Sequence, residues 1–286
     1  MQNFKGPLLL VASMALFALL DANSKLLAGR YGADQVLAIR YGTLLLLLLA
    51  ARLIRPGAGG PISTPRPWLH LLRAMCMAGS AYGFFLAFRE LPLAEGYLVY
   101  FTAPFFTLGL AALVLKESNG TAVWIWSGIG FLGVLIAMAP GLHADGPWAA
   151  YGWAFLGTLT YAGFLTISRL LQAESGAARL IVWSSLPLLL VILPFASASW
   201  VAPDAMDWLA LIANGVFAGG ATLALAIAFS IDRAARLAPL EFTAMLFAVI
   251  FDASIWGIWP SGWSLAGAVI VVFACLMSQR QTKPST

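Results

Sequence analysis

The sequence predicts an all-α integral membrane protein. Hydrophobic runs of membrane-spanning length recur from Pro7 to about Met277. Hydrophobic residues make up 61% of the chain and charged residues 10%, whereas soluble domains carry roughly 25% charged residues. The longest stretch between two runs, Ile54 to Arg66, has the size of an ordinary loop. Helices are predicted because lipid offers the backbone no hydrogen-bond partner.

Ten transmembrane helices are predicted, and the first run is typical of them. Residues 7–28 approach the roughly 20 apolar residues that are needed to cross about 30 Å of hydrocarbon. This run is too long for the hydrophobic region of a cleaved signal peptide, so we expect it to be kept as a span. The ten predicted spans cover residues 7–28, 33–53, 67–88, 91–115, 121–139, 147–170, 177–196, 206–230, 236–258 and 262–279.

The basic residues predict the orientation of these spans. Lys and Arg near span ends resist translocation and stay in the cytoplasm. With both termini in the cytoplasm, Arg30 and Arg89 alone among the basic residues of the connections lie on the external side. We expect the membrane to be the inner (cytoplasmic) membrane of a bacterium. The predicted cytoplasmic residues are Lys5, Arg52, Arg55, Arg66, Lys116, Arg169, Arg179, Arg233, Arg236, Arg280 and Lys283.

The sequence carries no pattern that predicts an enzyme, a metal site or a cofactor. Its two histidines, His70 and His143, are too few for a multi-His metal site. Cys76 and Cys275 lie inside predicted helices, where a small buried apolar side chain is the commoner role. The net charge of +4 is spread over loops, so it does not predict nucleic-acid binding.

The two halves of the chain repeat one another at several landmarks. Ser24-Lys25-Leu26-Leu27 resembles Ser168-Arg169-Leu170-Leu171, and Leu91-Pro92-Leu93-Ala94-Glu95 resembles Leu237-Ala238-Pro239-Leu240-Glu241. The predicted repeats are residues 1–140 and 141–286, with five helices each. Because five is odd, the second copy enters the membrane from the opposite side. Inverted repeats are a recurring architecture of secondary transporters, whose substrate binds near the midplane.

The chain also resembles a known family over nearly its whole length. Pro104 is followed by Leu115-Lys116-Glu117 at a helix exit and by a glycine-rich run over residues 128–134. These features are similar to the ten-helix EamA-type members of the drug/metabolite transporter superfamily, most of all to amino-acid exporters of the YddG type. One departure is Phe247, which stands where many relatives repeat the mid-helix proline, and bending is therefore expected to differ between the halves.

Aromatic residues in three predicted spans form the candidate binding surface. Tyr100 and Thr107 share a helical face with Pro104, which is expected to bend the span. Aromatic walls with a few hydroxyls suit small amphipathic solutes, although helix packing and interfacial anchoring are alternative roles for any single aromatic residue. The predicted contact residues are Tyr82, Tyr100, Thr107, Tyr161, Phe164 and Asn214.

Charged residues near the outer ends of two spans form a candidate gate. Asp21 and Lys25 are four residues apart and are expected to face each other, and Arg40 reaches the same level from the next span. These three residues would gate the entry of a carboxylate-bearing solute, or form a structural ion-pair network. Asp252 is interpreted either as a proton site or as an interfacial residue.

These features together predict a secondary transporter that exports small amphipathic metabolites by alternating access. Amino acids, aromatic ones included, are the expected substrates. The alternatives are another metabolite (a nucleoside, vitamin, methylated cofactor or cationic drug) and a non-transport binding or receptor protein. The predicted partners are the small-molecule substrate and the lipid bilayer, and the oligomeric state is left open, a monomer included.

Overall fold

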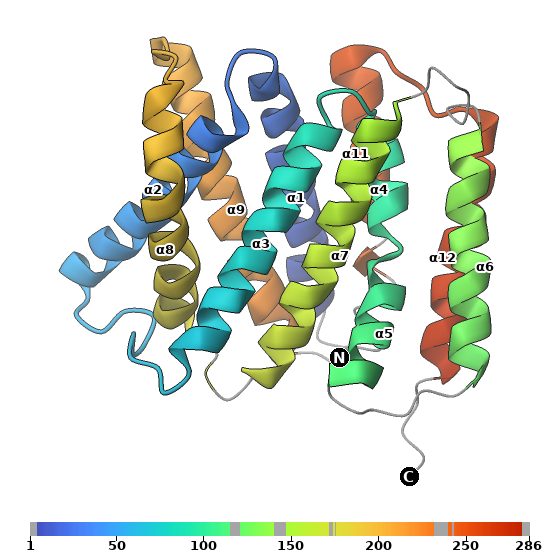
Figure 1. Cartoon of the computed structure of the whole chain (residues 1–286), viewed down its shortest axis with the longest axis horizontal. Helices are drawn as coiled ribbons and strands as arrows, with labels where there is room; N and C mark the ends of the chain where they lie inside the picture. The colour runs from blue at the N-terminus through green and yellow to red at the C-terminus, as the bar shows by residue number, and fades with distance from the viewer. Residues whose placement is uncertain are drawn as a thin grey trace.

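The chain folds into helices that run between two ends of the molecule (Figure 1). The computed structural model describes residues 5–114, 121–139, 147–171, 174, 176–231, 240–241 and 243–281. The predicted basic residues Lys116, Arg233, Arg236 and Lys283 lie outside this part, as does Leu115-Lys116-Glu117. The helices are α1 (Lys5–Ala28), α2 (Ala33–Ile54), α3 (Pro67–Ala87), α4 (Leu93–Tyr100), α5 (Ala103–Val114), α6 (Thr121–Met138), α7 (Trp148–Leu170), α8 (Ala177–Ala198), α9 (Ala205–Ile231), α11 (Thr243–Trp256) and α12 (Gly262–Gln281).

Most of these helices begin and end within two residues of the predicted spans. The span predicted over 91–115 is instead two helices, α4 and α5, separated at Phe101 and Thr102. The span predicted over 236–258 is described as a helix from Thr243 to Trp256, and part of its predicted beginning lies outside the described residues.

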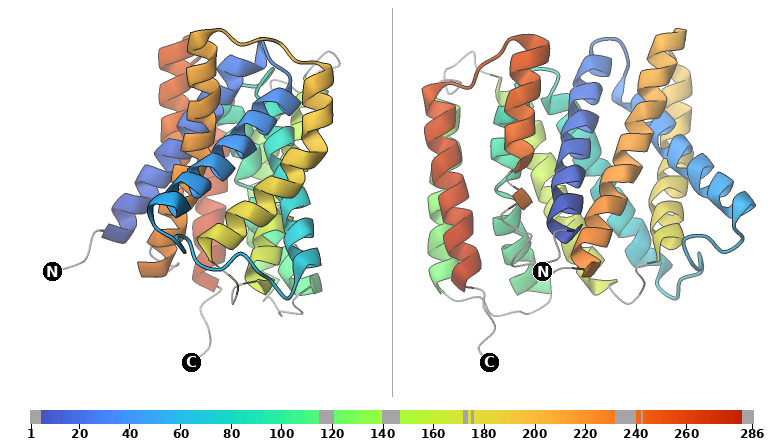
Figure 2. Two further views of the ribbon diagram at one scale, coloured as in Figure 1. Left: turned by 90° about the vertical axis from the view of Figure 1, so that its left-hand side faces the viewer. Right: turned by 180° about the vertical axis from the view of Figure 1, so that it is seen from behind.

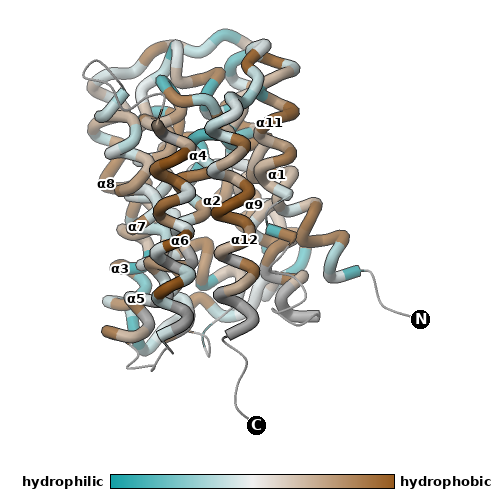
Figure 3. The backbone as a smooth tube through the Cα atoms, turned by 90° about the vertical axis from the view of Figure 1, so that its right-hand side faces the viewer, coloured by the Kyte–Doolittle hydropathy of each residue, from teal (hydrophilic) through white to brown (hydrophobic). Residues whose placement is uncertain are grey.

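The outer surface of the helices is strongly apolar, as a lipid environment requires. Leu53, Leu113 and Val269 are 77%, 79% and 70% exposed, and Figure 3 shows hydrophobic stretches along the middle of the helices. By length and composition six segments can each cross a membrane, and shorter apolar helices accompany them. The six are 5–28, 33–54, 67–87, 93–114, 177–198 and 205–225. The protein is therefore a multi-pass helical membrane protein, and the count of ten spans stays a prediction.

The most extensive packing joins a helix of the first half of the chain to a helix of the second half. The main pairs are α1 with α9, α2 with α8, α3 with α7 and α6 with α12. The α6–α12 pair lies at one side of the array, as two opposite views agree (Figures 1 and 2). Glycines permit the closest approach, because a Cβ on Gly267 of α12 would lie 2.5 Å from the Gly133 carbonyl oxygen of α6.

The connections divide between two ends, which we name the terminal end and the opposite end. At the terminal end α1 begins and α12 ends, and the α2–α3 and α7–α8 connections lie there (Figure 1). The α1–α2, α3–α4, α8–α9 and α11–α12 connections lie at the opposite end.

Candidate functional site

Four aromatic side chains of α4 and α7 form a continuous row between the helices. Ring centroids are 6.0 Å apart for Tyr97 and Tyr100, 5.1 Å for Tyr100 and Tyr161, and 6.0 Å for Tyr161 and Phe164. Phe84 of α3 meets Tyr100 edge-on at 6.0 Å. Tyr97 is buried, whereas the other members of this aromatic row keep part of their surface exposed. The row therefore joins three of the predicted contact residues, Tyr100, Tyr161 and Phe164.

The row passes the point where α4 ends and α5 begins. Pro104 has no N–H to donate to the carbonyl oxygen of Tyr100, so the helical hydrogen-bond ladder is interrupted there. The backbone N–H and the hydroxyl of Thr102 both donate to the Val99 carbonyl oxygen, at 3.0 and 2.6 Å. The predicted bend at Pro104 is thus a break, and it lies two residues before the proline.

Asp21 lies at one end of the aromatic row. The Tyr97 hydroxyl donates a hydrogen bond to the Asp21 carboxylate at 2.7 Å. The expected pairing of Asp21 with Lys25 is not seen in the structure, because the Lys25 ammonium group contacts Asp252, Leu91 and Trp256. Its ammonium group lies 3.7 Å from the Asp252 carboxylate, donates to the Leu91 carbonyl oxygen at 2.8 Å and lies 4.6 Å from the centre of the Trp256 ring.

Asp252 closes the start of α4 from a helix of the other half of the chain. Its side-chain oxygens accept the backbone N–H groups of Leu93 and Ala94 at 3.0 and 2.9 Å. Asp252 is 1% exposed, so its carboxylate is enclosed by other parts of the protein. A carboxylate at a helix N-terminus satisfies free N–H groups and complements the helix dipole. Asp252 therefore fixes α4, and with it Tyr97 and Tyr100.

Arg40 and Asn214 form a separate buried cluster with Ser24. Arg40 Nε donates to Asn214 Oδ1 at 2.6 Å, and Arg40 Nη2 donates to Ser24 Oγ at 3.1 Å. Asn214 Nδ2 donates to the same Ser24 oxygen at 2.9 Å. Asn214 is fully buried. The three predicted gate residues thus have different hydrogen-bond partners, although Asp21 and Arg40 interact electrostatically. Asn214 belongs to the Arg40 cluster, apart from the aromatic row.

Arg73 lies at the other end of the aromatic row. Its guanidinium carbon is 5.4 Å from the centre of the Phe164 ring. Nη2 donates to Ser184 Oγ at 2.7 Å and to the Leu180 carbonyl oxygen at 3.2 Å, both on α8. Sequence reasoning did not select Arg73 for the site. The available signal was a charged residue seven positions into a predicted span, which is costly in lipid and often functional.

Two other predicted contact residues lie apart from the row. Tyr82 packs edge-on against Trp153 at 6.3 Å, and these two side chains are 38% and 37% exposed. The Thr107 hydroxyl donates to the Ala103 carbonyl oxygen at 2.8 Å in its own helix. Tyr82 therefore occupies an exposed face of the α3–α7 pair, and the Thr107 hydroxyl is used within α5.

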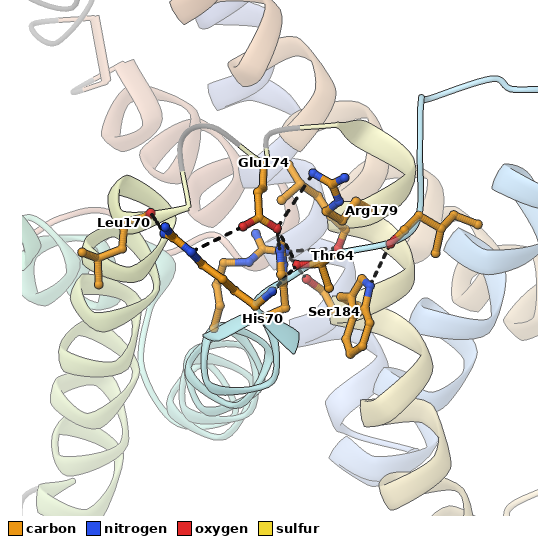
Figure 4. A network of polar contacts seen from close by, with 11 residues as sticks. Thr64, His70, Leu170, Glu174, Arg179 and Ser184 are labelled. Atoms are coloured by element: carbon orange, nitrogen blue, oxygen red, sulfur yellow. Dashed lines mark hydrogen bonds and ion pairs between the residues drawn. The ribbon is translucent and has the colours of Figure 1, made fainter. Parts of the chain in front are cut away.

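Glu174, between α7 and α8, gathers a polar network at the terminal end (Figure 4). Its carboxylate accepts a hydrogen bond from the Thr64 hydroxyl and lies 3.3 Å from His70 Nε2. Arg66 and Arg179 approach it at 3.9 Å each. The Thr64 hydrogen bond, with smaller contributions from His70 and Arg179, lowers the pKa of Glu174 below its usual value. This network was not predicted, because its members come from separate loops and helices.

An apolar cavity of about 460 Å³ lies between α5, α6 and α7. Its lining includes the exposed Leu113 and Trp124, with Phe105, Phe131 and Leu159. This lining offers no charged group and none of the predicted contact residues, so it suits a hydrocarbon chain better than a polar solute.

Comparison with known proteins shows what the chain is similar to. Residues 4–139 match the EamA-like transporter family. The first half of the chain is therefore similar to this family. Among EamA-like relatives the chain is 26% identical to the S-adenosylmethionine uptake transporter of Rickettsia conorii, covering 74% of this chain and 71% of the relative. It is 26% identical to the pseudopaline exporter CntI of Pseudomonas aeruginosa, over 97% of each chain. The riboflavin transporter of Brucella anthropi is 24% identical, over 95% and 97% of the two chains.

A protein of known crystal structure shares the fold. It superposes with a TM-score of 0.64 over 95% of this chain and 99% of the other, at 19% sequence identity. This likeness covers both halves of the chain, including the second half, which lies beyond the match to the family model.

Proposed function

We propose that this EamA-like protein is a secondary transporter that moves small amphipathic metabolites through a path along the aromatic row. The narrower proposal is the export of amino acids, aromatic ones included. One observation carries it: the row of Tyr97, Tyr100, Tyr161 and Phe164 has a carboxylate, Asp21, at one end and a guanidinium, Arg73, at the other. Ring faces suit the apolar part of a solute, and each charged end suits the opposite charge of a zwitterion as it moves along the row.

The pattern of helix pairs supports alternating access between two inverted repeats. Suppose that a rotation superposes the two repeats, so that α1 corresponds to α7, α2 to α8 and α3 to α9. This rotation places the α1–α9 pair on the α7–α3 pair. The α2–α8 and α6–α12 pairs are exchanged for themselves. A pseudo-two-fold axis in the membrane plane requires this relation. It supports repeats over residues 1–140 and 141–286 and a total of ten spans.

The proposed location is the inner membrane of a bacterium, with both termini in the cytoplasm. Lys5, Arg52, Arg55, Arg66 and Arg179 belong to helix ends and connections of the terminal end, and Arg30 and Arg89 to those of the opposite end. Positive residues are retained on the cytoplasmic side, so the terminal end is assigned to the cytoplasm.

A second candidate is a different metabolite, and the relatives favour it as much as amino acids. Their names include S-adenosylmethionine, pseudopaline and riboflavin. Those names also include both an uptake transporter and an exporter. The proposed outward direction therefore rests on the resemblance to amino-acid exporters and not on these relatives.

Transport into proteoliposomes tests the proposal. Labelled amino acids, S-adenosylmethionine and riboflavin are offered with and without a pH gradient, against empty vesicles. We expect saturable flux of an aromatic amino acid. Flux of only one of the other compounds would replace amino acids as the substrate, and no flux for any would count against transport.

Tyr100→Ala tests the aromatic row, with Tyr82→Ala as the matched control. Tyr100 contacts Tyr97, Tyr161 and Phe84 within the row, whereas Tyr82 lies on an exposed face. We expect Tyr100→Ala to lower kcat/KM for flux by about 10- to 100-fold, with normal insertion, and Tyr82→Ala to change it less than about threefold. Equal losses in the two variants would argue against the row as the path.

A further inference from the structure

We propose that Arg73 is the binding group for the carboxylate of the transported molecule. The inference rests on the proposed function and deepens it, because it restricts the substrates to amphipathic carboxylates. It places the anionic end of the substrate at Arg73 and the apolar part along Phe164 and Tyr161.

The first observation is that Arg73 is a buried charge inside a membrane span. The residue is 4% exposed and lies in α3. A guanidinium stays protonated in proteins, so Arg73 cannot avoid the cost of burial by losing its proton. Charged residues in spans are rare, and they pair with other groups or mark substrate paths.

The second observation is that Arg73 has no carboxylate partner among the described residues. The ion pairs of this part of the chain join Lys25 to Asp252, Arg30 to Asp207, and Glu174 to a set of neighbours. The neighbours of Glu174 are Arg66, His70 and Arg179. Arg40, the other buried arginine, donates to the Asn214 amide oxygen and the Ser24 hydroxyl and interacts electrostatically with the Asp21 carboxylate. Arg73 therefore carries a positive charge that the described fold does not neutralise.

The third observation is that the hydrogen bonds of Arg73 are incomplete. Nη2 is used by Ser184 and by the Leu180 carbonyl oxygen. Nε is buried and has no hydrogen-bond partner in the described part of the structure. A guanidinium offers five N–H donors in a plane, in an arrangement that matches a carboxylate. An unpaired buried donor is costly, and a bound carboxylate would supply both its acceptor and its counter-charge.

The fourth observation is the position of Arg73 against the aromatic row. The guanidinium lies over Phe164, and Phe164 and Tyr161 are stacked at an interplanar angle of 29°. Arginine stacks on a ring through its flat face, so its N–H groups point outward along the edge of the guanidinium. A carboxylate at that edge would leave the rest of the molecule beside the row. Few small solutes other than an amphipathic acid meet both conditions.

The competing role is a tie between α3 and α8 through Ser184 and Leu180. A tie requires only hydrogen-bond donors, which Arg73→Gln keeps in part, whereas carboxylate binding requires the positive charge. The two roles therefore differ in the chemistry of the solutes that the variants accept. Arg73→Lys keeps the charge and serves as the conservative variant, and Arg89→Gln removes an exposed arginine at the opposite end.

The experiment compares a carboxylate with its matched amide. Full-length protein in proteoliposomes transports labelled L-phenylalanine in the presence of unlabelled L-phenylalanine or L-phenylalaninamide. In the wild type and in Arg89→Gln we expect the carboxylate to inhibit at least about tenfold more strongly than the amide. In Arg73→Gln the ratio should fall to near one, and Arg73→Lys should retain part of it. An unchanged ratio in Arg73→Gln, or a wild-type ratio near one, overturns the inference.

A binding measurement separates this inference from the proposed function. The Tm of the purified protein in detergent is measured with phenylacetate and with phenylacetamide. We expect phenylacetate alone to raise the Tm of the wild type, and this rise to be lost in Arg73→Gln. That result without amino-acid flux supports the carboxylate site and rejects amino-acid transport. Flux in the wild type, with neither readout dependent on Arg73, supports transport and rejects the carboxylate site.

Discussion

At the two ends of the molecule, corresponding connections between helices are held together by different interactions. At the terminal end, Glu174 between α7 and α8 meets Thr64 of the α2–α3 connection and His70 of α3. At the opposite end, Asp207 of α9 meets Arg30 and Tyr31 of the α1–α2 connection. The His70 side chain is fully buried, whereas the Arg30 side chain is 65% exposed. The charged contacts of the terminal end are therefore largely buried, whereas the ion pair of the opposite end is exposed at Arg30 and is accompanied by the Tyr31 hydrogen bond.

Backbone contacts also differ between the two ends. At the terminal end, the Ala178 N–H donates to the Gly59 carbonyl oxygen at 2.9 Å. Gly59 has a φ of +76°, and a Cβ there would lie 2.8 Å from the Ala178 nitrogen, so this close approach needs glycine. At the opposite end the Gln35 amide bonds both the N–H and the carbonyl oxygen of Val201, at 3.0 and 2.7 Å.

The comparison bears on how a rocking motion would start. In the proposed repeat, the α7–α8 connection corresponds to the α1–α2 connection, so each end joins one half of the chain to the other. An exposed ion pair contributes little and is screened by salt, whereas a buried carboxylate that loses its partners is strongly destabilising. We infer that the opposite end separates more readily than the terminal end.

Glu174→Gln gives the largest expected effect on this comparison. The substitution removes the charge that faces Arg66, His70 and Arg179, and it leaves these cations without their shared partner. We expect Tm in detergent to fall by about 5 °C. Glu90→Gln, at an exposed position of the α3–α4 connection, is the control and should change Tm by less than about 1 °C. Equal shifts in the two variants would remove the distinction between the ends.

The pH dependence of stability sharpens the same point. The pKa of Glu174 is lowered in the folded protein, chiefly by the Thr64 hydrogen bond. Its stabilising contribution is therefore complete above the ordinary glutamate pKa of about 4.3 and is lost as pH falls through the lowered pKa. We expect the Tm difference between the wild type and Glu174→Gln to be constant from pH 8 to about pH 6 and to shrink below about pH 4.3.

Taking the difference in Tm between the wild type and Glu174→Gln cancels the contributions of groups that titrate alike in both proteins. His70 faces the same carboxylate, so its contribution is checked with His70→Gln in the same series. A Tm difference that grows as pH falls would contradict the assigned direction of the Glu174 pKa.

Much of the helical arrangement could be predicted from the sequence, because lipid allows few alternatives. Most predicted spans match helices within two residues, since the change from apolar to polar residues sets both limits. Pro104 predicts a bend because the proline is visible in the sequence. The helix is interrupted at Phe101 and Thr102, because the carbonyl group that the proline leaves unbonded lies one turn earlier.

The candidate site could be predicted only in part. Tyr82 and Tyr100 look alike in the sequence, because both lie in helices that are apolar on every side and periodicity cannot separate a lipid-facing side from an interior one. Partners far apart in the chain were missed for a related reason. Lys25 contacts Asp252, and His70 contacts Glu174, because of how the helices pair, which local spacing in the sequence does not show.

Arg30→Gln gives the smallest expected effect and tests the opposite end. Arg30 Nη1 donates to both oxygens of Asp207 at 3.0 and 2.9 Å, and the Tyr31 hydroxyl donates to the same carboxylate at 2.5 Å. That hydroxyl bond raises the pKa of Tyr31 to about 12. Because Tyr31 still holds Asp207 after the substitution, we expect Tm to fall by only about 1 °C at low salt.

Salt provides the control for this last measurement. An exposed pair is screened beyond about 3 Å at 1 M salt, so the Tm difference between the wild type and Arg30→Gln should vanish there. The Glu174→Gln difference should persist in the same buffer, because two of its charged partners, His70 and Arg179, have side chains that are only 0% and 12% exposed. If 1 M salt removed both differences, the two ends would be held by the same kind of interaction, and the opposite end would have no reason to separate first.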